Sequence, residues 1–134
     1  MRQILSIIAG LTTAYLIIVM AQMIKEGLYP TPMDLDFSDK SKVDAWFATL
    51  PSKAFLIIAI SHALASFSAG FISSLVSGIN RYIFGLISVS VIFVTVIIFL
   101  FTYNFPTWFV ITDTVATAVL GFLGVILGGS RYTS

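Results

Sequence analysis

Four long apolar runs occupy most of this chain, and each is long enough to be a membrane-spanning helix. A helix needs about 20 apolar residues to cross a hydrocarbon core about 30 Å thick. Within the runs, only His62 and Asp113 carry a charge or gain one near neutral pH. A chain that exposed so much apolar surface to water would aggregate, so we expect its solvent to be a lipid bilayer. The runs cover approximately residues 3–24, 54–77, 82–102 and 108–129.

Composition supports a single membrane-embedded domain over residues 1–134. Hydrophobic residues make up 58% of the chain and charged residues only 10%, against about 25% charged residues in a typical soluble domain. The longest polar segment, residues 25–53, is too short for a separate soluble domain. The fold class that we predict is therefore an all-α membrane protein with four transmembrane helices. The formal net charge of +1 leaves no basic surface for nucleic acid.

The polar segment contains a predicted short amphipathic helix over residues 40–50. Val43, Trp46, Phe47 and Leu50 follow the i, i+3, i+4, i+7 spacing of one apolar helix face. We expect this helix to lie flat at the membrane boundary, with Trp46 and Phe47 in the lipid or over the mouth of the bundle.

Two N-terminal caps compete for this short helix, and aromatic residues mark the boundary elsewhere. Ser41 with Asp44 resembles a capping box, whereas Asp39 alone is the other candidate. Between the third and fourth runs, Tyr103 and Trp108 have the amphipathic rings that favour the headgroup level.

Small side chains recur at steps of three and four along the second and fourth runs. Helices in lipid associate through close backbone approach at such residues. We therefore expect these two helices to pack tightly, either within one subunit or between subunits. The third run is apolar all round, and we expect it to be the most lipid-exposed helix. The small residues are Ala59, Ala63, Ser66, Gly70, Ser73 and Ser77 in the second run and Thr117, Gly121, Gly124 and Gly128 in the fourth.

Three polar residues are predicted to gather near the end of the bundle that carries the short helix. Counted from Lys53 at about 1.5 Å per residue, His62 lies about 13 Å into the membrane. Asp113 lies about 8 Å in from the same side, counted from Trp108, and Gln22 ends the first run near that surface. Asp113 shares a helix face with Thr117, so we expect its carboxylate to point into the bundle.

Two interpretations of this cluster are open. Ionisable groups inside a membrane are costly and are usually functional, which favours a proton or ion relay. The structural alternative is that Asp113 caps the start of its helix and His62 bonds a neighbouring helix.

Metal binding and enzymatic chemistry find little support in the sequence. Asp34, Asp36 and Asp39 lie close together, but they lack the spacing, the glycine and the closing glutamate of a calcium-binding EF-hand loop. We interpret them as a solvated loop with a helix cap, in preference to a weak cation site. The chain has no cysteine and no G-x-S-x-G or H-E-x-x-H motif. We expect no metal, no cofactor and no enzymatic activity.

Positive charges give a divided prediction for orientation. Arg2, Arg81 and Arg131 lie on one side of the predicted topology, and the four lysines of residues 25–53 lie on the other. A bare count favours the lysine side as cytoplasmic. Groups adjacent to the spans, with the N-terminal amine, favour the arginine side slightly. We predict that both termini are cytoplasmic.

Several short motifs resemble those of a family of small bacterial four-span membrane proteins. The resemblance extends over nearly the whole chain and implies a four-span fold in a bacterial inner membrane, without implying a mechanism. Members often have a glutamate and a histidine near the end of the first span, where this chain has Gln22 and Glu26. The motifs are Leu28-Tyr29-Pro30-Thr31-Pro32, Asp36-x-x-Asp39, Leu50-Pro51, Ser61-His62-Ala63-Leu64-Ala65-Ser66-Phe67, Gly70-Phe71, Pro106-Thr107-Trp108-Phe109 and Leu127-Gly128-Gly129.

The sequence thus predicts a small integral membrane protein and leaves two functions open. We expect first an oligomer-forming or accessory subunit that acts through helix packing, with the small-residue faces as its contact surfaces. Its partners would be the lipid bilayer and either further copies of itself or other membrane proteins. The alternative is a small oligomeric transporter or channel that uses Gln22, His62 and Asp113 near its outer mouth.

Overall fold

The computed structural model describes residues 1–130, and in this part of the chain it contains five α-helices and no strand. Four of the helices are long and apolar enough to cross a membrane, so the predicted all-α membrane fold is confirmed and the protein is a multi-pass membrane protein. The helix ends lie within four residues of the predicted limits. The helices are α1 (Arg2–Leu28), α2 (Lys40–Ala48), α3 (Ser52–Val76), α4 (Arg81–Thr102) and α5 (Thr107–Ser130).

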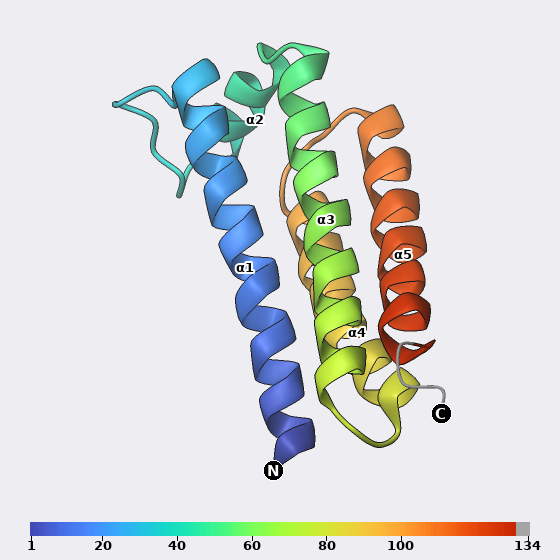
Figure 1. The fold of residues 1–134 in the computed structure, drawn as a ribbon. Helices are drawn as coiled ribbons and strands as arrows, with labels where there is room; N and C mark the ends of the chain where they lie inside the picture. Colours follow the sequence, from blue (N-terminus) through green and yellow to red (C-terminus); the bar gives the residue numbers. More distant parts are fainter. Residues whose placement is uncertain (131–134) are drawn as a thin grey trace.

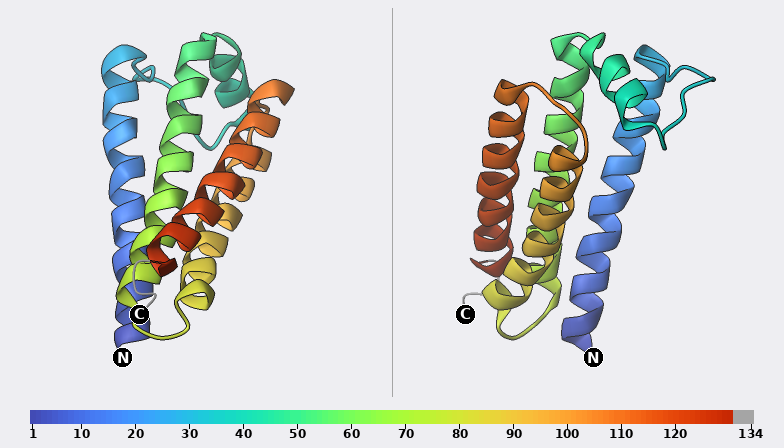
Figure 2. Two further views of the ribbon diagram at one scale, coloured as in Figure 1. Left: turned by 45° about the vertical axis from the view of Figure 1, so that its right-hand side comes forward. Right: turned by 180° about the vertical axis from the view of Figure 1, so that it is seen from behind.

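The four long helices run side by side in alternating directions (Figure 1). The start of α1, the α3–α4 turn and the end of α5 lie at one end of the bundle. Helix α2 and its flanking loops lie at the other end, which we call the loop end (Figure 2). Arg2 and Arg81 therefore lie at the same end, as predicted, and Arg131 lies outside the described residues.

Helix α3 forms the centre of the bundle and is packed against α1, α4 and α5. Half of its most apolar window is buried, compared with 33% for α4, 28% for α5 and only 17% for α1. The prediction that the third span is the most lipid-exposed is therefore wrong, because α4 packs one face against both α3 and α5. Helix α1 is the exposed helix, since it is buried along one narrow stripe: Ser6, Gly10, Ala14 and Lys25.

Glycines bring α3 and α5 into backbone contact within one chain. A methyl group added at Gly124 would overlap the backbone carbonyl of Phe67, and one at Gly128 would overlap that of Phe71. A methyl group at Gly70 would lie 2.7 Å from the carbonyl oxygen of Gly121. The small-residue faces of the two helices therefore meet each other inside the subunit at these glycines, whereas Ser73 of α3 contacts α1 and α4.

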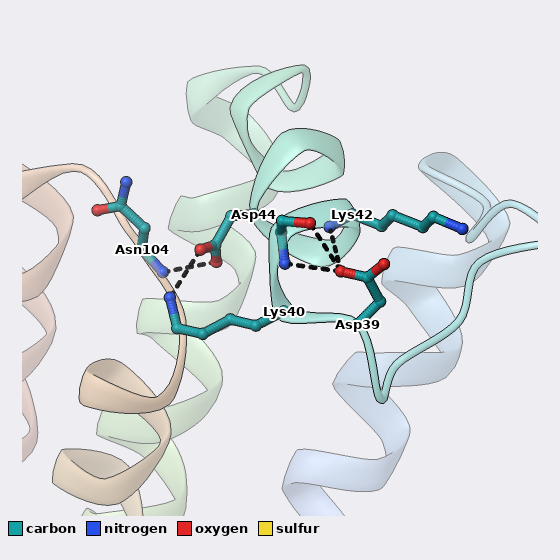
Figure 3. Close-up of polar contacts among 6 residues, drawn as sticks. Asp39, Lys40, Lys42, Asp44 and Asn104 are labelled. Carbon is teal, nitrogen blue, oxygen red and sulfur yellow. Dashed lines mark hydrogen bonds and ion pairs between the residues drawn. The ribbon is translucent and has the colours of Figure 1, made fainter.

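Polar contacts cap the N-terminus of α2 and join the helix to Asn104 (Figure 3). The Asp39 carboxylate accepts hydrogen bonds from the backbone N–H groups of Ser41 (3.1 Å) and Lys42 (3.4 Å), so Asp39 is the N-cap. The alternative capping box is wrong, because Asp44 accepts instead from the backbone N–H of Asn104 (2.9 Å) and from Lys40 Nζ (2.7 Å). The bond between Asp44 and Asn104 attaches α2 to the segment between α4 and α5.

The apolar face of α2 closes the bundle mouth. Val43 and Phe47 are buried, and the Phe47 ring lies 4.9 Å from the ring of Phe105. Phe47 is thus not exposed to lipid. Of the two predicted placements, the one over the mouth of the bundle is the one that Phe47 adopts. Trp46 is half-buried, and Trp108 is 41% exposed at the start of α5. The helix ends at Ala48, two residues before its predicted limit.

Candidate functional site

A buried histidine–aspartate pair joins the two central helices near the loop end. His62 comes from α3 and Asp113 from α5. The distance between His62 Nδ1 and Asp113 Oδ2 is 2.7 Å, and the side chains are 7% and 0% exposed. The two residues are 51 positions apart in the sequence, and the close approach of α3 to α5 brings them together.

Neighbouring side chains complete the surroundings of the pair. The second oxygen of Asp113 accepts a hydrogen bond from the hydroxyl of Thr117, one helical turn later (3.1 Å). The hydroxyl of Ser66 donates to the Thr117 carbonyl (2.9 Å). The ring of Phe99, from α4, meets the His62 ring edge to face at 5.5 Å. Asp113 therefore does not cap α5, because its two oxygens bond the side chains of His62 in α3 and of Thr117 one turn further along α5.

Gln22 does not join this cluster. Its side chain is exposed on α1, and among residues 1–130 it forms no hydrogen bond with either member of the pair. The sequence correctly placed Gln22 near the same end of the bundle. However, it did not fix the rotation of α1, which buries Lys25 instead. The structure therefore brings together two of the three predicted residues.

A pocket at the loop end lies directly beside the pair. Its volume is about 340 Å³, and its wall is formed by all of the helices except α5, together with the loop between α1 and α2. Phe99 belongs both to the wall of the pocket and to the contact with the His62 ring. The lining residues are Gln22, Lys25, Glu26, Thr31, Phe37, Trp46, Phe47, Ile58, Phe99 and Tyr103.

A second polar cluster lies in the opposite half of the bundle and contains only hydroxyl and backbone groups. Ser73 of α3 donates to the backbone carbonyl of Ser6 in α1 (2.9 Å) and shares a hydrogen bond with the Ser88 hydroxyl of α4 (2.6 Å). All three residues are buried. The sequence analysis placed Ser73 on a packing face but missed Ser6 and Ser88, although their spacing from Gly10 and Gly85 on the same helices was a usable signal.

Phe99 and Lys25 were also missed, for a different reason. Phe99 sits in a run of apolar residues, and nothing in that run marks it as the neighbour of a histidine. Lys25 is buried because α2 folds back over the end of α1 and places Trp46 against it. The position of α2 depends on the path of the loop that precedes it, and the sequence of this loop has no periodic apolar pattern from which the path could be predicted.

The acidic loop residues are occupied by local hydrogen bonds. Asp36 accepts from the hydroxyl and backbone N–H of Ser38, and Asp39 accepts from the hydroxyl of Ser41. The Ser38 hydroxyl lowers the pKa of Asp36, and the Ser41 hydroxyl lowers the pKa of Asp39. Within residues 1–130, no three histidine, aspartate or glutamate side chains are grouped so that they could hold a metal ion.

No protein-family model, curated protein or solved structure matches this chain. The resemblance to small bacterial four-span membrane proteins therefore stays a prediction. The buried pair and its surroundings are the features of the molecule that bear on its function.

Proposed function

We propose that this protein is a small membrane transport protein in which the His62–Asp113 pair binds and releases a proton. The observation that supports the proposal is the 2.7 Å contact between two ionisable side chains buried in membrane-spanning helices. A proton held at this contact can reside on either the imidazole or the carboxylate, depending on what else occupies the site. Such a site links protonation to the relative position of α3 and α5.

Energetics disfavour the alternative that the pair only holds the helices together. An aspartate costs about 2.5 to 3.5 kcal/mol at the centre of a membrane helix, and less towards the boundary, where Asp113 lies. Interhelical hydrogen bonds in membranes contribute about 0.6 kcal/mol on average. The α3–α5 contact is already formed by Gly70, Gly121 and Gly124. An asparagine would supply the hydrogen bond to His62 without the cost of a charge.

The pocket supplies a route for protons from the loop end. Phe99 contacts both the pocket and the His62 ring, and in this proposal a change of its rotamer opens the route. The charged groups on the pocket wall are Lys25 and Glu26 of α1, and Asp113 faces the imidazole from α5. From α2, Asp44 faces the α4–α5 connection instead of the pair.

Proton flux in reconstituted liposomes tests the proposal. We expect the protein to dissipate or use a proton gradient, followed with a pH-sensitive dye inside the vesicles, and we expect Asp113→Asn and His62→Gln to abolish the signal. Asp34→Asn, which removes an exposed loop carboxylate, is the matched control and should leave the flux unchanged. Equal flux in Asp113→Asn and the unmodified protein would refute the proposal.

An accessory-subunit function is the second candidate, and a groove between α1 and α3 favours it. The groove has a volume of about 350 Å³ and an almost wholly apolar wall, and it lies on the most exposed helix of the bundle. We expect a partner helix to bind at this groove, because the glycine contacts of α3 and α5 are used within the chain. Native mass spectrometry of the gently extracted protein tests this candidate, since co-purifying polypeptides would favour it. The lining residues are Ile17, Met20, Ala21, Ile24, Ile57, Ile60, Ser61 and Leu64.

The proposal includes a non-enzymatic role and a location in a bacterial inner membrane with both termini cytoplasmic. The chain has no cysteine, so single-cysteine variants at Gln3 and Asp34, at opposite ends of the bundle, can be labelled without background. We expect a membrane-impermeant thiol reagent added outside the cells to label only the cysteine at position 34.

A further inference from the structure

The wall of the loop-end pocket contains a buried lysine with an incomplete set of partners. Lys25 is 5% exposed although it lies in the last turns of α1. Its ammonium group lies 5.1 Å from the centre of the Trp46 ring and 3.8 Å from Glu26 Oε1. The first contact is a cation–π interaction, and the second is an ion pair that is too long for a hydrogen bond.

The ammonium group of Lys25 therefore retains its hydrogen-bonding capacity. A lysine ammonium has three N–H donors, and none of them forms a hydrogen bond with the described part of the chain. Glu26 does not satisfy them, because its carboxylate accepts from the backbone N–H of Thr31 (3.0 Å) and from the Thr31 hydroxyl. Because Lys25 lines the pocket, its N–H donors are available to an acceptor that enters there, and such an acceptor would complete the hydrogen bonding of this charge.

We infer that the pocket binds an oxyanion, either a phosphate or a carboxylate, whose oxygens accept hydrogen bonds from Lys25. The Gln22 amide on the same wall offers a further donor. Trp46, Tyr103 and Phe99 line the pocket with aromatic rings, which would hold the apolar part of the ligand. A volume of about 340 Å³ suits a phospholipid headgroup or a small organic acid.

This inference stands on Lys25 and does not require that the His62–Asp113 pair moves protons. The two sites share Phe99, so an anion in the pocket would lie against the ring that covers His62. If both sites function, the protein would bind an anion at Lys25 and a proton at the His62–Asp113 pair, and the two sites would be neighbours.

Tryptophan fluorescence provides the test. A Trp108→Phe background leaves Trp46, which contacts Lys25, as the sole tryptophan. The purified full chain in lipid-free detergent is titrated with sodium phosphate and with sodium hexanoate at constant ionic strength. In a second arm, the protein is reconstituted in phosphatidylcholine vesicles with and without phosphatidylglycerol.

We expect a saturable change of Trp46 emission that Lys25→Gln weakens at least tenfold and that Lys25→Arg retains. Lys42→Gln removes an exposed lysine of the same loop end and should leave the titration unchanged. A response to the soluble anions identifies a small-anion site, and a response confined to phosphatidylglycerol identifies a lipid headgroup site. No saturable response in either arm, or an equal response in Lys25→Gln, would overturn the inference.

A second variant keeps the test decisive if Lys25→Gln does not fold. Glu26→Gln changes an exposed side chain and removes the one negative charge that lies next to the Lys25 ammonium within residues 1–130. We expect it to tighten anion binding several-fold. Unchanged affinity in Glu26→Gln would count against an anion at Lys25. Proton flux is measured in the same variants, and normal flux in a variant that has lost anion binding would show that the two proposals are independent.

Discussion

The two buried polar clusters of the bundle join helices by different chemistry. The cluster near the loop end uses an imidazole, a carboxylate and the Thr117 hydroxyl to connect α3 with α5. The cluster in the opposite half connects α1, α3 and α4 through Ser73, Ser88 and the backbone of Ser6. The second cluster joins three helices without any ionisable group.

This difference shows that an ionisable pair is not needed to join helices in this bundle. Hydroxyl groups and carbonyls tie helices together in this bundle at a site where Gly10 and Ala69 also bring two helices close. The proposed proton binding would give the acid and the histidine near the loop end a role that the serine cluster cannot have. Four experiments test the comparison, in order of decreasing effect.

Gly124→Ala should have the largest effect on stability. The added methyl group would overlap backbone atoms of Phe67, which cannot rotate away, so α3 and α5 must separate. Overpacking of this kind costs about 1 to 3 kcal/mol, and the separation should also break the His62–Asp113 contact. The free energy of unfolding from an SDS titration measures the first effect. Gly27→Ala makes the same change where the added methyl group meets nothing within 4 Å, and it should not destabilise.

Asp113→Asn should abolish proton binding at a smaller cost in stability. Asparagine keeps a hydrogen bond to His62, so we expect a change in unfolding free energy below about 1.7 kcal/mol, the largest measured for such bonds in a membrane bundle. Infrared difference spectra between low and high pH should lose the carboxyl band that the unmodified protein shows. A large loss of stability with an unchanged carboxyl band would mean that the pair is structural.

Ser73→Ala should weaken the serine cluster without affecting proton binding. It removes two hydrogen bonds, which together contribute about 1 kcal/mol. The infrared carboxyl band and the proton flux should match those of the unmodified protein. If Ser73→Ala also abolished the flux, the two clusters would have to be parts of one pathway and the comparison would fail.

Acidification should release α2 from the segment between α4 and α5. The hydrogen bond from the backbone N–H of Asn104 is the largest cause of a lowered pKa of Asp44 in the folded protein, and the bond from Lys40 is the second. The bonds of Asp44 are therefore fully formed above the usual aspartate value of about 3.9 and are lost as the pH falls through the lowered value. Hydrogen exchange at the Asn104 amide should rise in this range. Asp44→Asn should remove most of that pH dependence, and an unchanged profile in this variant would contradict the assignment.

Periodicity in the sequence predicted the elements of the fold, because spans and the amphipathic helix depend on local patterns of apolar residues. The approach of His62 to Asp113 was also predictable, since both could be placed by depth from the same boundary and Asp113 shares a face with Thr117. The exposure of α1 was not predictable in this way. Its apolar residues look like those of α4, and only the packing of α4 between α3 and α5 distinguishes the two. The burial of Lys25 depends on the loop path and was equally out of reach.

The separation of His62 and Asp113 along the chain has a consequence for biosynthesis. Helix α3 enters the membrane well before α5 is made, so His62 waits in the bilayer without its partner. Asp113 is an unfavourable residue for insertion when it is alone, and a helix that already contains His62 offers it an acceptor or donor on arrival. We therefore expect the insertion of α5 to be easier in a chain whose α3 is already in the membrane.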